Sequence, residues 1–299
     1  RRLQSCLQRM ESLLAQHDGV ADVVWLKLRG AVTRLRKHFQ KSQETLSPAG
    51  SVLRANELLA RSMRTPSDAQ ALTAAGEAYL DSGLYEVAER CLQKTKDRGI
   101  QDGGRSAFLL GQCAFHLEQY ERAAQTFDCA VTQGWPPAEV TGWQAGALYE
   151  IDRHDEAEQC ARNGLDYVEG KSAALLQSLI GKIYLGRQNT EEAEKWFAQA
   201  YAADATAAVT RYGLGLCALA RRDGVTAGDL FASLLGHPDE GPLGMLGLGM
   251  LAAEQSDTPL AIQYLTAAVQ HFPAHGVAHA RLGECFFEAG EYAKALHHC

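Results

Sequence analysis

A pattern of small and apolar residues recurs seven times between residues 69 and 299. Each copy starts with a small residue, here called the anchor. Ala follows twelve positions later, an aromatic or other apolar residue four positions after that, and in several copies another Ala three positions further on. Successive anchors are 35, 34, 36, 34, 34 and 34 residues apart, and they are Gly76, Gly111, Ala145, Gly181, Gly215, Gly249 and Gly283. A unit of this length buries its apolar side only by stacking on its neighbours, so the pattern predicts a linear array of similar modules.

Within each copy, the apolar residues follow helical spacing on both sides of a short polar break. Such breaks occur at residues 81–83, 118–120 and 187–189. Each copy is therefore predicted to be a hairpin of two helices. The small anchor lets the first helix approach the second closely, and the later Ala and aromatic residues form the facing stripe. Proline occurs near the ends of copies, at 136–137 and at Pro273. It ends a helix there, and because it has no N–H it leaves no backbone donor without a partner.

These residues and their spacing resemble the tetratricopeptide repeat family, whose unit is a helix–turn–helix of about 34 residues. The resemblance covers residues 69–299 and implies an all-α, right-handed superhelical solenoid of antiparallel helix hairpins that binds proteins and is not an enzyme. The third copy departs from the pattern, because Gly142 and Gly146 beside its anchor leave its register open by one residue. The seventh copy stops inside its second helix at Cys299, and the chain begins at Arg1 without Met, so we expect a piece of a longer protein.

Residues 1–66 are predicted to form a separate, basic helical segment ahead of a repeat region at residues 67–299. A helix over about 51–64 could be the second half of a degenerate repeat. Residues 1–64 carry 12 Lys or Arg and 5 Asp or Glu, whereas residues 65–299 carry 17 and 31. The basic stretch at 34–41 is interpreted as a solvated helix face. Docking of this stretch on the acidic repeats, or contact with an acidic partner, anionic lipid or RNA, stays open.

The acidic repeat region is expected to bind no nucleic acid, because such affinity rests on clustered cations that neutralise phosphates. No run of about 18 uncharged apolar residues occurs, so no membrane span is expected. The eight cysteines include no C-x-x-C pair. They are interpreted as unpaired core thiols, which predicts a reducing, cytoplasmic location.

No catalytic residue and no cofactor is predicted, because the sequence contains no P-loop, H-E-x-x-H or G-x-S-x-G motif. The Gly-Leu-Gly triplets at 213–215 and 247–249 look like phosphate-binding loops, but both fall inside predicted first helices, where helix packing explains them. The segment His297-His298-Cys299 suggests a metal site at first sight. Adjacent residues on a helix do not converge on one ion, so no metal site is expected.

In the family that the sequence resembles, the first helices line a concave groove with residues at offsets of −3, +1, +4 and +5 from the anchor. Carried onto this chain, the predicted partner-binding groove consists of Phe108, Gln112, Phe115, Trp143, Tyr149, Lys182, Tyr212, Leu216, Leu246, Met250 and Phe287. The same offsets also include His116, Ser178, Leu185, Gly186, Leu219, Ala220, Ala253, Glu254, Ala280, Glu284 and Glu288. Only Lys182 is of the Lys, Asn and Arg type with which some members clamp acidic peptide tails. We therefore expect the groove to recognise an amphipathic helix or an apolar segment of a protein partner.

Three alternatives remain open from the sequence. Much of the groove lining could pack against neighbouring hairpins or the N-terminal helices instead of a partner. The chain could be the substrate- or partner-selecting arm of a larger multidomain enzyme or multisubunit complex whose catalytic part lies outside it. Self-association through the open C-terminal repeat is the third alternative, because an uncapped array can stack end to end.

Overall fold

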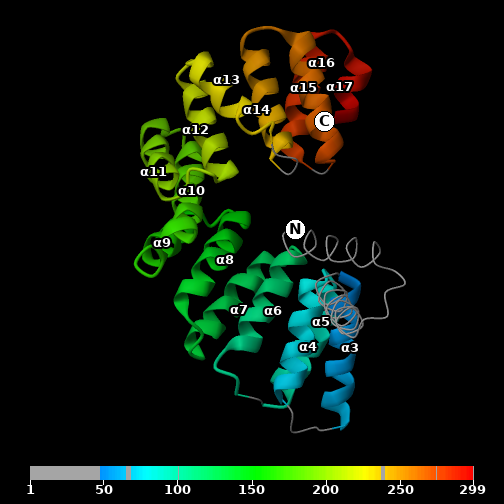
Figure 1. Cartoon of the computed structure of the whole chain (residues 1–299). Helices are drawn as coiled ribbons and strands as arrows, with labels where there is room; N and C mark the ends of the chain where they lie inside the picture. The colour runs from blue at the N-terminus through cyan, green and yellow to red at the C-terminus, as the bar shows by residue number, and fades with distance from the viewer. Residues whose placement is uncertain (1–47, 65–68, 100, 237–239, 274, 299) are drawn as a thin grey trace, which may run out of the picture. The chain divides into compact units, whose positions relative to one another are not determined.

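The computed structural model of the chain describes residues 48–64, 69–99, 101–236, 240–273 and 275–298. In these residues the chain forms fifteen α-helices and no β-strand (Figure 1). The helices are α3 (Pro48–Arg64), α4 (Ala69–Asp81), α5 (Tyr85–Asp97), α6 (Arg105–His116), α7 (Tyr120–Thr132), α8 (Pro137–Glu150), α9 (His154–Gly164), α10 (Gly170–Gly186), α11 (Thr190–Ala203), α12 (Ala208–Ala220), α13 (Gly224–Ala232), α14 (Gly241–Glu254), α15 (Thr258–His271), α16 (Gly276–Glu288) and α17 (Tyr292–His298). The helix predicted over 51–64 is α3, whereas the predicted helices before it lie outside the described residues.

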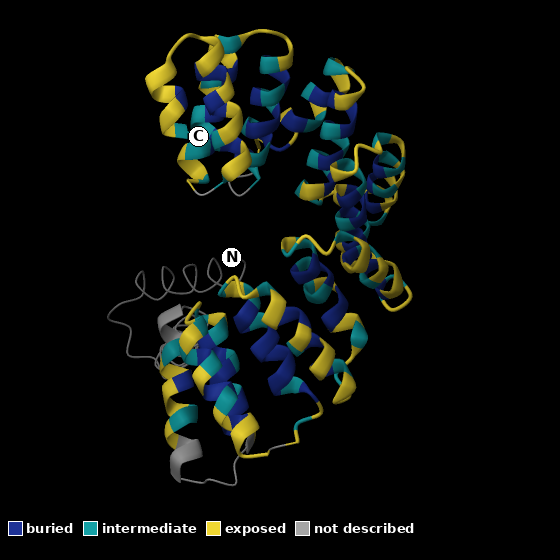
Figure 2. Ribbon diagram, turned by 180° about the vertical axis from the view of Figure 1, so that it is seen from behind, coloured by how far each residue is buried: buried dark blue, intermediate teal, exposed yellow. Residues whose placement is uncertain are grey.

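The helices divide into two compact units, the first ending at Trp135 and the second starting at Pro136. In the first unit, α3 packs against α4, and the hairpins α4–α5 and α6–α7 stack on one another. In the second unit, the five hairpins from α8–α9 to α16–α17 follow in order, and each first helix contacts the first helix of the next hairpin. Buried residues follow the seams between the helices in each unit (Figure 2). The predicted all-α solenoid of helix hairpins is therefore confirmed, while the boundary predicted between residues 66 and 67 lies outside the described residues.

Every hairpin turns through a left-handed residue seven positions after its anchor. Gly occupies this position in the first and last hairpins, at Gly83 and Gly290. In the other five hairpins φ is 59–61° at Glu118, Asp152, Gln188, Arg222 and Ser256. The next residue donates its N–H to a carbonyl five positions back and thereby closes the first helix, as Arg153 does to Leu148 at 3.0 Å. Because Asp152 shares this turn geometry, the register of the third copy follows Ala145 as its anchor.

The anchors are small because a large side chain of the second helix lies directly against them. A Cβ atom built on Gly111 would lie 2.5 Å from the ring of Phe127, which is fully buried. In the third hairpin the anchor is Ala145 instead of glycine, and the second helix carries the small, buried Ala161 in place of a large side chain. An extra methyl group on one helix is thus matched by a smaller side chain on the other, as a close-packed interior requires.

The Gly-Leu-Gly triplets are packing features, as the sequence predicted. A Cβ atom on Gly213 would lie 2.3 Å from the Phe197 ring of the preceding hairpin. A Cβ atom on Gly215 would lie 2.4 Å from the Phe231 ring of its own hairpin. The helix α12 is therefore closely approached by aromatic rings from two successive hairpins, and in α14 Gly247 meets the Phe231 ring while Gly249 meets Leu265.

Four of the six cysteines that the structure describes are buried free thiols, namely Cys91, Cys113, Cys217 and Cys285. Burial raises the pKa of both Cys113 and Cys217 to about 12, so neither is a thiolate near neutral pH. In the described part of the chain, no helix is long and apolar enough to cross a membrane.

Candidate functional site

The predicted groove residues that precede an anchor by three positions face the protein interior in two hairpins. Phe108 is 8% exposed, and its ring packs against Phe127 and Trp135 at centroid distances of 6.1 and 5.4 Å. Leu246 is 1% exposed and belongs to the core of the last hairpins. Phe108 and Leu246 are therefore corrected from groove lining to core, because at this offset their side chains pack inside the hairpin stack.

Tyr212, Leu216 and Met250 lie half-buried at the edge of the core. The Tyr212 ring packs against Phe231 with the ring centroids 5.6 Å apart, and its hydroxyl donates to the sulfur of Met250 at 3.8 Å. Burial raises the pKa of Tyr212 to about 12. These contacts make Tyr212 a support beneath the surface rather than a freely accessible binding residue.

Two predicted groove residues meet on neighbouring first helices of the second unit. The ammonium nitrogen of Lys182 on α10 lies 4.4 Å from the centre of the Tyr149 ring on α8, within the range of a cation–π contact. Trp143 is half-buried on the same helix as Tyr149. In the first unit, Gln112 and Phe115 lie half-buried on α6.

A cavity of about 200 Å³ lies among α12, α14 and α16, the first helices of three consecutive hairpins. Its apolar residues are Leu219, Met250, Ala253 and Cys285, and its charged residues are Glu254, Arg281, Glu284 and Glu288. Six of these eight stand at the +1, +4 and +5 offsets that the family resemblance assigned to the groove. We call this site the inner cavity.

Acidic residues dominate the border of the inner cavity. Glu254, Glu284 and Glu288 are all exposed, and the one cation, Arg281, pairs with Glu284 at an N···O distance of 3.0 Å. The pKa of Cys285 at this site is raised by burial and also by Glu288 and Glu284, with Arg281 opposing them. The field inside the cavity is therefore set by excess negative charge.

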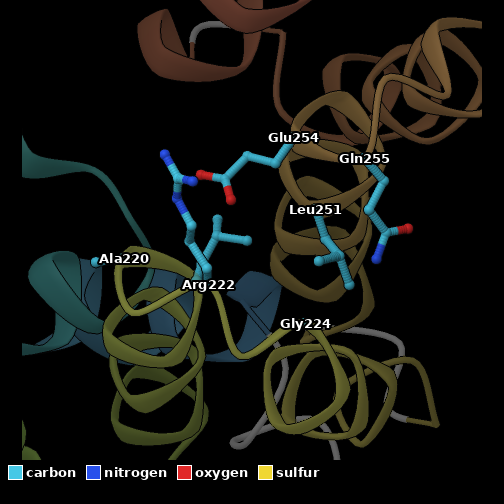
Figure 3. Close-up of a pocket in the computed structure, with 7 residues that line it drawn as sticks. Ala220, Arg222, Gly224, Leu251, Glu254 and Gln255 are labelled. Atoms are coloured by element: carbon cyan, nitrogen blue, oxygen red, sulfur yellow. The ribbon is translucent and has the colours of Figure 1, made fainter.

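A second cavity of about 590 Å³, here called the notch, shares Leu219 and Glu254 with the inner cavity. It lies between the end of α12, the start of α13 and the end of α14. In Figure 3 the side chains of Arg222 and Glu254 point toward one another across this space. Gly224 at the start of α13 leaves room for Gln255, whose amide nitrogen would lie 3.2 Å from a Cβ atom at that position.

Next to the notch, an ion pair is missing that joins successive hairpins at two earlier places in the second unit. At those places a Glu thirteen positions after one anchor pairs with an Arg six positions after the next anchor. These pairs are Glu158 with Arg187 and Glu194 with Arg221, each with an N···O distance of 2.6 Å. The equivalent positions next to the notch hold Gly228 and Gln255, which cannot form an ion pair. The ion pair that bridges the earlier hairpins is therefore absent next to the notch.

Sequence reasoning did not single out Arg222, Gly224, Gln255 or Arg281 as site residues. A signal for the notch was present, because aligning the seven copies on their anchors shows glycine where three earlier copies carry glutamate. No comparable signal marks Arg281, which stands two positions before an anchor and reaches the cavity only through the packing of α16 on α14.

Among the residues that the structure describes, no group of three or more His, Cys, Asp and Glu side chains is placed to hold a metal ion. The inner cavity is smaller than the roughly 300 Å³ at which small-molecule sites usually begin, so it suits one side chain rather than a cofactor.

The stacked hairpins define a helical-repeat protein. Residues 73–139 and residues 252–298 each match the family described as tetratricopeptide repeat. With the hairpin stack, these matches show that the chain contains tetratricopeptide repeats, and such repeats indicate a protein–protein interaction scaffold. A comparison with curated proteins gave no match.

Solved structures with the same fold include three that cover most of this chain. A chain in the crystal structure of the APC/C hetero-tetramer Cut9–Hcn1 is 15% identical with a TM-score of 0.65, over 95% of this chain and 52% of that chain. A tetratricopeptide repeat protein from Parabacteroides merdae is 14% identical with a TM-score of 0.63, over 77% and 90%. PilF of Pseudomonas aeruginosa is 18% identical with a TM-score of 0.58, over 74% and 97%. The present chain thus spans about half the length of the first of these proteins, and the likeness concerns the fold.

Proposed function

We propose that this protein is a non-catalytic scaffold that holds a segment of a partner protein at the inner cavity. The observation that carries the proposal is the cavity itself, where α12, α14 and α16 bring six residues at the predicted groove offsets to one place. Its size favours insertion of one side chain, with the rest of the segment lying across the exposed glutamates. A segment held by one inserted side chain suits adaptor proteins, because a few buried contacts carry most of the binding energy in protein interfaces.

The binding segment is proposed to be a helix or an extended strand with at least one large apolar residue. The apolar side of the cavity supports this choice, because Leu219 is 5% exposed while Met250 and Ala253 are half-buried next to it. Methionine suits such a surface, since its flexible thioether adapts to ligands of different shape. Burial of about 100 Å² of apolar surface there would contribute roughly 2.5 kcal/mol before the costs of association.

Ala253→Gln tests this proposal, because the longer side chain occupies the inner cavity and glutamine is compatible with a helix. The matched control is Ala202→Gln, which places the same change on an exposed position of α11, a second helix. Both variants and the parent chain are used to capture proteins from an extract of the source cells. We expect Ala253→Gln to lose partners that Ala202→Gln retains, with equal helical circular dichroism. Equal retention by the two variants would exclude the inner cavity as the binding site.

A reducing compartment such as the cytoplasm is proposed as the place of action. The support is chemical: Cys129 is an exposed free thiol. Exposed thiols are tolerated where the cell keeps cysteines reduced. Fractionation of cells that express the tagged protein tests this assignment.

A further inference from the structure

We infer that the inner cavity selects a segment in which a large apolar residue is flanked by Lys or Arg, an inference that rests on the proposed function. The sequence alone had pointed to an apolar or amphipathic ligand without a preferred charge. The border of the cavity indicates a preference for positive charge, because the exposed residues around it are mainly glutamates.

The charge argument depends on which carboxylates remain unpaired. Arg281 contacts Glu284, so its positive charge is already shared with one of the three acids. Glu254 and Glu288 form no ion pair with any residue that the structure describes. Arg222 points toward Glu254 from the notch (Figure 3), but the two form no ion pair in the described part of the chain. Two unpaired carboxylates beside one cavity attract a cationic ligand and repel an anionic one.

The apolar floor sets the second requirement. Met250 and Ala253 approach the cavity from α14, and Cys285 lies beside them on α16 with 2% exposure. A ligand with positive charge alone would leave this surface in contact with water, while a purely apolar ligand would leave the glutamates without counter-charges. A segment that carries both features satisfies the floor and the border together, with an apolar side chain inserted and basic residues on either side.

The charges disfavour the repeat region of a second copy as the occupant. Residues 65–299 carry 31 acidic and 17 basic side chains, so the repeat region of a second copy would bring more negative charge to an acidic border. Like charges placed across an interface weaken it and suppress that pairing. The proposed occupant is a basic segment of another polypeptide that carries a large apolar residue, and the basic stretch of this chain at residues 34–41 is its competitor.

The test uses a phage-displayed library of random 12-residue peptides, selected on the whole chain. Parallel selections use Ala253→Gln, the double variant Glu254→Lys/Glu288→Lys, and the control Asp166→Lys/Asp229→Lys. The control makes the same charge change at exposed acids on the second-helix side. Circular dichroism and thermal unfolding of each variant establish that it is folded before selection.

Peptides from the parent chain that fail on Ala253→Gln should be enriched in Lys or Arg next to a large apolar residue. Their affinity should fall at least tenfold on Glu254→Lys/Glu288→Lys and change less than twofold on the control, and the fall should shrink at high salt. Selection on Glu254→Lys/Glu288→Lys should enrich Asp and Glu instead. Cavity-dependent peptides without basic enrichment would overturn this inference and leave the proposed function standing. An absence of any peptide sensitive to Ala253→Gln would overturn both.

Discussion

His279 and His298 face each other with their Nδ1 atoms 2.9 Å apart, which joins α16 to α17. The Nε2 atom of His279 lies 2.9 Å from the carbonyl oxygen of Pro273. A carbonyl oxygen only accepts, so His279 carries its proton on Nε2, and its Nδ1 accepts from the Nδ1–H of His298. These two hydrogen bonds assign the tautomers of both neutral rings. The two Nδ1 atoms share one proton, and a second proton does not fit between them.

The last hairpin should therefore lose stability on acidification. The pKa of His298 is lowered by burial and by the neighbouring His279 and His297, while Lys294 lies over the Phe286 ring on which His298 stacks. Since the folded pKa lies below the unfolded value of about 6.5, the unfolded state binds more protons between these two pKa values, and stability falls as pH drops through that window. Hydrogen exchange of α17 amides, corrected for intrinsic rates, should be faster near pH 5 than near pH 7.5.

His298→Asn provides the control for this pH effect. The Asn side-chain nitrogen can donate from nearly the position of the imidazole Nδ1, but it does not titrate. Exchange in α17 should then lose most of its dependence on pH in this range. A variant that keeps the full pH dependence would show that another group is responsible.

Gly247→Ala should destabilise the second unit by about 1–3 kcal/mol, the usual cost of overpacking a core. A Cβ atom at Gly247 would lie 2.2 Å from the Phe231 ring, which is fully buried and cannot move aside. The same substitution at Gly142 meets no atom within 4 Å on an exposed face of α8. Gly142→Ala should instead stabilise the helix by about 0.5–1 kcal/mol. Denaturant unfolding that shows the same sign for both variants would contradict this packing account.

Gln188→Gly should raise the stability of the turn after α10 by about 1 kcal/mol. Gln188 has φ of 59°, a left-handed conformation that costs roughly 1–2 kcal/mol for a residue with a Cβ atom. Gln188→Ala keeps the Cβ atom and should bring no gain. The midpoint of denaturant unfolding for the two variants distinguishes relief of backbone strain from a side-chain effect.

Glu158→Gln should weaken the stack between α9 and α10. The Glu158 side chain is 14% exposed and accepts hydrogen bonds from Arg187 at 2.6 Å, Arg162 at 2.7 Å and Tyr184 at 2.9 Å. Burial raises the pKa of Glu158, but these three hydrogen bonds outweigh it and hold the pKa below its usual value. The amide should cost about 1–2 kcal/mol near neutral pH, because charge-assisted hydrogen bonds are lost.

The more exposed pair of Glu194 with Arg221 provides a comparison on the next stack. Glu194→Gln should cost less than about 1 kcal/mol, as is usual for surface ion pairs. The two costs are compared by thermal unfolding at neutral pH. Below the folded pKa of Glu158, the difference between its variant and the parent should vanish, because the carboxylate is then protonated in both states.

The periodicity of the sequence was sufficient to predict the class of fold. Small anchors, the Ala twelve positions later and the apolar residue four positions beyond it recur in phase, and this pattern is local enough to read from one chain. It also predicted that Gly213 and Gly215 serve packing, which the contacts of Phe197 and Phe231 confirm. Side-chain direction was less predictable, as Phe108 and Leu246 show, because an offset within a repeat does not reveal which neighbouring ring will cover a residue.

The sequence by itself determined that the chain forms stacked helical hairpins, because each repeat must bury its apolar stripe on a neighbour. Only the tertiary structure decided which residues are left accessible once that stripe is buried. The packing of α12, α14 and α16 turns large apolar residues such as Leu246 inward, and it leaves Glu254, Glu284 and Glu288 around a small apolar floor. Burial and charge at this surface arise from contacts between hairpins about 34 residues apart, and these contacts depend on three-dimensional packing rather than on the local pattern of any one repeat.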